Sequence, residues 1–142
     1  MPNGRTHDRI NLILLPIILI ASTIILKSIP DVLIISAAYL FSSFMFNGDL
    51  DTNSSVYNRW WLMKIIWIPY QLIFTHRSIF THGILIGTII RILYLGIIPF
   101  IILHYNQDIN IIDNIISTKQ LILGFIGLEL GNTIHTISDK IF

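Results

Sequence analysis

The sequence contains no cysteine and few charged residues, and each shortage excludes a class of protein. Without cysteine, the chain of 142 residues forms no disulfide and offers no thiolate ligand to a metal. Charged residues make up 12% of the chain, about half the share of a typical soluble protein. The net charge is +1 and the Lys and Arg residues form no basic run, so no nucleic-acid partner is expected.

Apolar residues are abundant instead. They make up 54% of the chain, and the mean hydropathy is +0.74. A domain of this size cannot hide so much apolar surface inside its own core. The sequence therefore predicts an all-α integral membrane protein, with residues 1–142 forming one membrane domain in contact with membrane lipid.

Four apolar runs are candidates for membrane-spanning helices: residues 10–26, 32–46, 84–103 and 121–137. Residues 59–75 contain all three tryptophans. Because tryptophan prefers the headgroup level of a bilayer, this segment is interpreted as a helix lying in the interface, the alternative being a fifth span. Gly-x-x-x-Gly spacings at 83–87 and 127–131 predict faces where helices pack closely.

Histidines and aspartates gather at the ends of these segments, in clusters at 4–8, 48–51, 76–82 and 135–139. With four spans, counting the crossings places all of these clusters on one side of the membrane, whereas a fifth span would separate them. Six cations lie on this side, against Lys27 and Lys119 on the other. The positive-inside rule therefore predicts an inner-membrane protein whose termini and clusters face the cytoplasm.

Imidazole and carboxylate are ligands that zinc and manganese accept. His135 and Asp139 are four residues apart and share a helix face, whereas Asp49 and Asp51 converge only in a turn. Taken singly, each cluster is equally consistent with solvated or helix-capping residues, and their convergence is what favours a metal. We predict one or two divalent transition-metal ions, zinc or manganese, two being bridged by a carboxylate such as Asp51. The predicted ligands are His7, Asp49, Asp51, His76, His82, His135 and Asp139.

Three further charged residues have both a functional and a structural interpretation. Arg77 lies between two predicted ligands and suits a phosphate or carboxylate, or else contacts lipid headgroups. Arg91 and Glu129 fall inside spans at matching depths, where unpaired charge is costly. The structural interpretation is a buried ion pair between them, and the functional one makes Glu129 a ligand or a base beside the metal.

Several motifs carry a resemblance to known families: Gly-Arg-Thr-His-Asp at 4–8, Gly-Asp-Leu-Asp at 48–51, Arg-Trp at 59–60 with Trp-Ile-Pro-Tyr-Gln at 67–71, and His-Arg-Ser-Ile-Phe-Thr-His-Gly at 76–83. Through them the chain resembles an uncharacterised bacterial family of small membrane proteins described as metal-binding. More distantly it is similar to the membrane-bound metal-dependent hydrolases, which share an aspartate pair, a His-Arg…Thr/Ser-His segment and a late His-x-x-x-Asp.

These features together predict a metal-dependent hydrolase with Arg77 and Glu129 as catalytic residues. Its substrate would be a lipid or another amphipathic phosphoester reached at the cytoplasmic face. No Ser-His-Asp or Cys-His order argues for a covalent route. One alternative is a non-catalytic membrane protein that binds, senses or transports metal, although ligands at the ends of spans do not suit a transporter. Another is a structural membrane protein whose polar clusters contact only headgroups.

Overall fold

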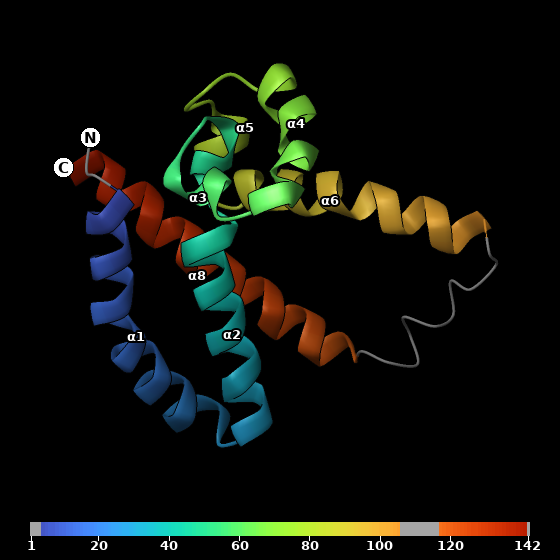
Figure 1. Ribbon diagram of the computed structural model, residues 1–142. Coiled ribbons are helices and arrows are strands. Elements are labelled where there is room, and N and C mark those ends of the chain that lie inside the picture. The colour runs from blue at the N-terminus through green and yellow to red at the C-terminus, as the bar shows by residue number, and fades with distance from the viewer. Residues whose placement is uncertain (1–3, 106–116, 142) are drawn as a thin grey trace.

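Three long helices form the frame of the protein. The computed structural model describes residues 4–105 and 117–141. In it, α1 (Gly4–Leu26) and α2 (Ile29–Met45) form a hairpin, and α8 (Thr118–Ile141) packs chiefly against α2. Figure 1 shows the beginning of α1 close to the end of α8. The two ends of the described chain therefore meet at one end of the helical frame.

Short helices form a cap over the end of α2 (Figure 1). They are η1 (Gly48–Asp51), α3 (Ser55–Asn58), η2 (Trp61–Ile66), α4 (Trp67–Ile73) and α5 (Ile79–His82). The core of this cap is largely aromatic: Trp67 and Tyr70 are fully buried and pack with Phe46 and Leu50. Stacked and edge-to-face rings bury a large area in a small volume, which allows such short elements to hold a fixed arrangement.

Two glycines allow α8 to approach α2 closely. A Cβ atom added at Gly127 would lie 2.5 Å from the carbonyl oxygen of Ile35, and one at Gly131 would lie 2.7 Å from the Cβ of Ser42. The Gly-x-x-x-Gly spacing at 127–131 predicted this close packing, and the structure confirms it. The spacing at 83–87 serves a local turn instead. A Cβ atom added at Gly87 would lie 2.6 Å from the carbonyl oxygen of Thr81, in the preceding helix α5.

The predicted spans correspond to helices with somewhat different bounds. Three segments are long and apolar enough to cross a membrane: Gly4–Leu26, Ile29–Asp51 and Thr118–Ile141. Their outer surface is apolar, as the isoleucines of α1 illustrate, with Ile13 exposed by 71% and Ile25 by 75%. The predicted span at 84–103 corresponds to α6 (Ile86–Tyr105), which is not among these three segments. The count of four spans therefore stays a prediction.

The segment 59–75 is not the single helix that the sequence predicted. It divides into η2 and α4, and Trp61, where η2 begins, has a left-handed φ of 49°. Trp67 is enclosed by protein, with Trp60 and Tyr94 5.2 and 5.7 Å away between ring centroids. Trp61 and Leu72 remain 77% and 83% exposed. Trp67 is thus buried by the packing of aromatic rings in the cap. Because Trp61 and Leu72 remain exposed, the location of this segment in the membrane interface stays a prediction.

Candidate metal centre

The aspartate turn after α2 is shaped by local hydrogen bonds. The side chain of Asn47 accepts a hydrogen bond from the backbone N of Asp49 at 3.1 Å. Ser54 closes the turn by donating its hydroxyl to the carbonyl of Asp49 at 2.8 Å. In the resulting 3-10 helix, η1, the carboxylates of Asp49 and Asp51 face the two different ring nitrogens of His82.

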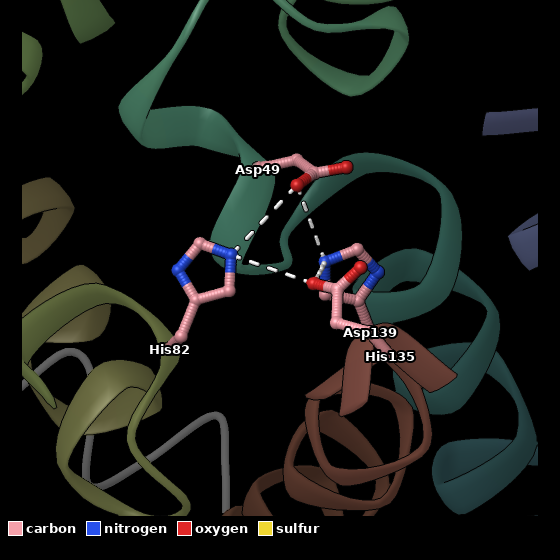
Figure 2. A group of neighbouring side chains, drawn as sticks. All are labelled: Asp49, His82, His135 and Asp139. Carbon is pink, nitrogen blue, oxygen red and sulfur yellow. Dashed lines mark ion pairs between the residues drawn. The ribbon is translucent and has the colours of Figure 1, made fainter. Parts of the chain in front are cut away.

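Four of the predicted ligands come together where the cap meets the end of α8: Asp49, His82, His135 and Asp139 (Figure 2). One ligand atom from each lies within 4.8 Å of the others. The Nε2 atom of His135 lies 3.3 Å from Asp49 Oδ1 and 3.4 Å from Asp139 Oδ2. The Nε2 atom of His82 lies 3.8 and 3.7 Å from the same two oxygens. Zinc bonds of about 2.0–2.2 Å give tetrahedral edges of roughly 3.3–3.6 Å, so these distances are close to those around one ion.

The ligand atoms lack the hydrogen bonds that buried polar atoms normally make. Among the described residues, Nε2 of His82, Nε2 of His135 and Oδ2 of Asp139 are buried without a hydrogen-bond partner. Each histidine nitrogen lies within ion-pairing distance of Oδ2 of Asp139 but lacks the geometry of a hydrogen bond to it. Leaving such an atom unsatisfied costs about 1–3 kcal/mol. Several unsatisfied atoms directed at one point therefore fit a divalent cation.

The far side of the His82 ring determines which of its nitrogens can bind a metal. The hydroxyl of Thr81 donates to the carbonyl of Ser78 at 3.2 Å and lies 3.1 Å from Nδ1 of His82. With its proton directed to the carbonyl of Ser78, the hydroxyl oxygen is available to accept an Nδ1–H. Oδ2 of the buried Asp51 lies 3.4 Å from the same nitrogen. A proton on Nδ1 leaves the lone pair on Nε2, the atom that faces the other ligands.

Asp51 lies behind His82 and outside the group of four. Its carboxylate contacts Nδ1 of His76 at 2.7 Å and accepts a hydrogen bond from the backbone N of Arg77 at 3.0 Å. Burial by itself would lower the pKa of His82, but the carboxylates of Asp49 and Asp51 outweigh it and raise this pKa to about 9. The metal-free histidine therefore holds a proton at neutral pH, which a metal has to displace.

His7 joins the group from the first helix. Its Nε2 lies 3.2 Å from Oδ1 of Asp139, and its ring centroid lies 4.5 Å from that of His135. The neighbouring Asp8 pairs with Arg59, whose Nη1 lies 3.1 Å from Oδ1, and this pair joins the start of α1 to the cap. The structure thus brings all seven predicted ligands together, with His7, Asp51 and His76 surrounding the group of four.

The glycine of the aspartate turn is required by the ring of His82. A Cβ atom at Gly48 would lie 2.8 Å from Cδ2 and 2.9 Å from Nε2 of that ring. Any larger residue would push the histidine away from the other ligands. From the sequence, Gly48 signals only a turn, because its contact with a residue 34 positions later exists only in the folded chain.

Arg91 and Glu129 have partners different from the predicted ones. Arg91 is fully buried and donates to the carbonyl of Thr81 at 2.6 Å and to Oδ1 of Asn132 at 2.7 Å. Glu129 accepts a hydrogen bond from the backbone N of Leu85 at 2.8 Å. No ion pair joins Arg91 to Glu129 in the part of the chain that the structure describes, so the predicted pair is wrong. The predicted depths of Arg91 and Glu129 gave their positions along the two helix axes. They did not give the direction in which each side chain points around its axis, which decides whether the two meet.

Sequence reasoning missed the supporting roles of Thr81 and Asn132. By donating to both, Arg91 links Thr81, which precedes His82 in the sequence, to Asn132, which lies one helical turn before His135. The signal that could have found them is the charge of Arg91 itself, because a buried guanidinium needs several acceptors. An acceptor on each neighbouring segment was therefore to be expected, whether or not it was charged.

Helices throughout the described ranges, with this group of histidines and aspartates, are typical of a metal-binding protein. The chain belongs to the family described as uncharacterized metal-binding protein (DUF2227), which it matches over residues 2–142. An uncharacterized protein of Aquifex aeolicus (strain VF5) is 36% identical over 58 residues, covering 40% of this chain and 40% of that protein. No solved structure matches the chain. The predicted metal-binding family is confirmed.

Proposed function

We propose that the protein is a metal-dependent hydrolase of the inner membrane that cleaves a phosphoester at the cytoplasmic face. The observation that carries this proposal is the convergence of unsatisfied, buried ligand atoms of His82, His135 and Asp139 beside an open cavity. The hydrolase assignment draws on the residue pattern that the chain shares with membrane-bound metal-dependent hydrolases.

A membrane location is supported by three apolar helices whose outer surfaces remain exposed. In water such surfaces would be costly, because burial of apolar area is the main favourable term in folding. The metal group lies at the end of the frame where α1 begins and α8 ends. With the excess of Lys and Arg on that side, the group would face the cytoplasm.

The ligand set suits zinc or manganese. Two imidazole nitrogens and two carboxylate oxygens are borderline and hard donors, which both ions accept. One group of four ligands favours a single ion at this position. His7 and His76 lie outside the group, and a second ion would have to recruit one of them.

The reaction would take place in a cavity of about 540 Å³ that His82, Asp139 and Arg77 help to line. When bound, the ion supplies Lewis-acid chemistry and lowers the pKa of a nearby water. In the hydrolysis of a phosphomonoester, the water oxygen forms a bond to phosphorus, the bond to the alcohol oxygen breaks, and that oxygen takes up a proton. Arg77 would stabilise the charge that develops on the phosphoryl oxygens. Glu129, bonded to the turn before α6, supports that turn.

A non-catalytic metal-binding role is the second possibility, and one observation favours it. Four protein ligands form a closed shell, which is typical of structural zinc, whereas catalytic zinc usually keeps a position open for water. The cavity argues for the enzyme, because two of the four ligand residues, His82 and Asp139, help to line it.

The test combines metal analysis with an activity panel. Purified protein is expected to carry about one zinc or manganese ion and to hydrolyse at least one amphipathic phosphoester in a chelator-sensitive manner. Arg77→Ala should retain its metal and lose turnover, whereas Arg9→Ala, an exposed arginine of α1, should retain both. Metal-loaded protein that is inert across the panel would favour the non-catalytic role.

A further inference from the structure

The cavity beside the metal group has two chemically different parts. Arg77 and Lys140 line it together with the ligands His82 and Asp139. The isoleucines of its wall are exposed by 62%, 49% and 40%, and these are Ile79, Ile84 and Ile86. A site with cations and metal ligands in one part and branched aliphatic side chains in another suits an amphipathic anion.

We propose that this cavity binds a phosphate monoester with a single hydrocarbon chain, an inference that rests on the proposed hydrolase function. The phosphate would lie between the metal group and the two cations, and the hydrocarbon chain would lie against the isoleucines. The volume of about 540 Å³ falls in the range of roughly 300–1,000 Å³ typical of small-ligand sites. A lipid with two long chains needs more apolar surface than three isoleucines provide.

The two cations are available for a ligand. Within residues 4–105 and 117–141, the ion pairs of arginine and lysine are those of Arg59 with Asp8 and of Lys119 with Asp31. Arg77 and Lys140 take part in neither. A phosphate provides the acceptor oxygens that a forked guanidinium and an ammonium group both bind well.

The backbone at Arg77 is held in an uncommon conformation. Its φ of 61° lies in the left-handed region, and its N–H donates to Oδ2 of Asp51. Such strain in a residue other than glycine tends to persist where the surrounding structure imposes it for a function. Arg77 and His82, which are five positions apart, line the same cavity.

Binding of dodecyl phosphate tests the inference without relying on turnover. The probe is titrated into metal-loaded protein held in amphipol, with inorganic phosphate, phosphatidic acid and dodecyltrimethylammonium as competitors. Each methylene buried is worth roughly a factor of four in affinity. Dodecyl phosphate should therefore bind more than about a hundredfold more tightly than inorganic phosphate, and the cationic amphiphile should not compete.

Variants connect this binding to the cavity. Lys140→Gln and Arg77→Gln should each weaken binding of dodecyl phosphate roughly tenfold, because a hydrogen bond to a charged group is lost. Arg9→Gln is the matched control and should bind as the wild type does. In manganese-loaded protein, the phosphorus resonance of the bound probe should broaden strongly, since the phosphate would lie next to the ion.

The outcomes separate this inference from the proposed function. Unchanged binding in both Lys140→Gln and Arg77→Gln would overturn the inference, as would competition by inorganic phosphate or by phosphatidic acid at equal concentration. Those results would leave the hydrolase proposal standing if another ester is turned over. Conversely, cavity-dependent binding of dodecyl phosphate with no turnover of any ester would support the inference and refute the hydrolase.

Discussion

Replacing Asp51 tests whether this carboxylate binds the metal or orients a residue that does. Its Oδ2 lies 3.4 Å from Nδ1 of His82, on the side of the ring away from the other ligands. Removing a group that orients a ligand typically costs 10–100-fold in metal affinity, or about 1.4–2.7 kcal/mol. Asp51→Ala should therefore weaken zinc binding within that range.

A milder substitution separates charge from hydrogen bonding. In Asp51→Asn, the amide oxygen can still accept from the backbone N of Arg77, and the amide NH₂ can donate to His76. Only the negative charge near His82 is removed, so the zinc affinity is expected to fall about tenfold. Removing the imidazole itself should cost more. Structural sites with four ligands bind zinc with a free energy of about 10–16 kcal/mol. One ligand of the four accounts for on the order of 3 kcal/mol, so His82→Ala should lower the zinc affinity more than a hundredfold.

The double variant decides between the two roles. If Asp51 acts only through His82, then adding Asp51→Ala to His82→Ala should cause little further loss, and the coupling energy should equal the whole effect of Asp51→Ala. The measurement is competition for zinc against a chelating dye, with circular dichroism to verify that each variant is folded. Asp31→Asn is the matched control, because Asp31 pairs with Lys119 at the other end of α2. Fully additive losses would refute this reasoning and make Asp51 a ligand.

Other features lead to further expected results. Gly48→Ala should weaken zinc binding by at least about tenfold, because the added Cβ would meet the ring of His82 at 2.8 Å; normal affinity would show that the ring has room to shift. Zinc binding at pH 7 should release about one proton, because metal-free His82 has its pKa raised to about 9. The zinc affinity should therefore rise about tenfold per pH unit up to pH 9. Calorimetry in buffers of different ionisation enthalpy measures the proton release. Arg91→Met should destabilise the protein by roughly 3 kcal/mol, since two buried acceptors lose their donor; an unchanged unfolding midpoint in detergent would contradict this. Single cysteines at Asn53 and Lys27 should differ in intact cells, with an impermeant maleimide labelling only position 27; labelling at 53 alone would invert the topology.

The sequence by itself determined the long helices and the chemistry of the site. Apolar runs of this length predict helices, because in a bilayer every backbone polar group would have to be satisfied without water. The order of the runs then predicted which clusters lie on the same side of the membrane. His7 and Asp139 stand far apart in the sequence, and counting the crossings predicted that both lie on one side; in the structure their side chains lie 3.2 Å apart.

Other features depended on directions that the sequence does not specify. In the turn after α2, Asp49 and Asp51 have the same chemistry and nearly the same position in the sequence. Only the fold of η1 directs one toward Nε2 of His82 and the other toward Nδ1. The partners of Arg91 likewise depended on rotation about the helix axis, which changes by about 100° per residue and is set by packing.

The segment 59–75 shows the same division between local pattern and tertiary structure. Its tryptophans and apolar residues predicted an interfacial helix, and Trp61 and Leu72 are indeed exposed, although the segment divides into two helices. They could not indicate that Trp67 would become the centre of the cap's core, because its neighbours Phe46 and Tyr94 come from distant parts of the chain. The sequence determined which side chains can bind a metal or contact lipid. Tertiary packing decided which of them face one another, because a contact between distant residues depends on every element that lies between them.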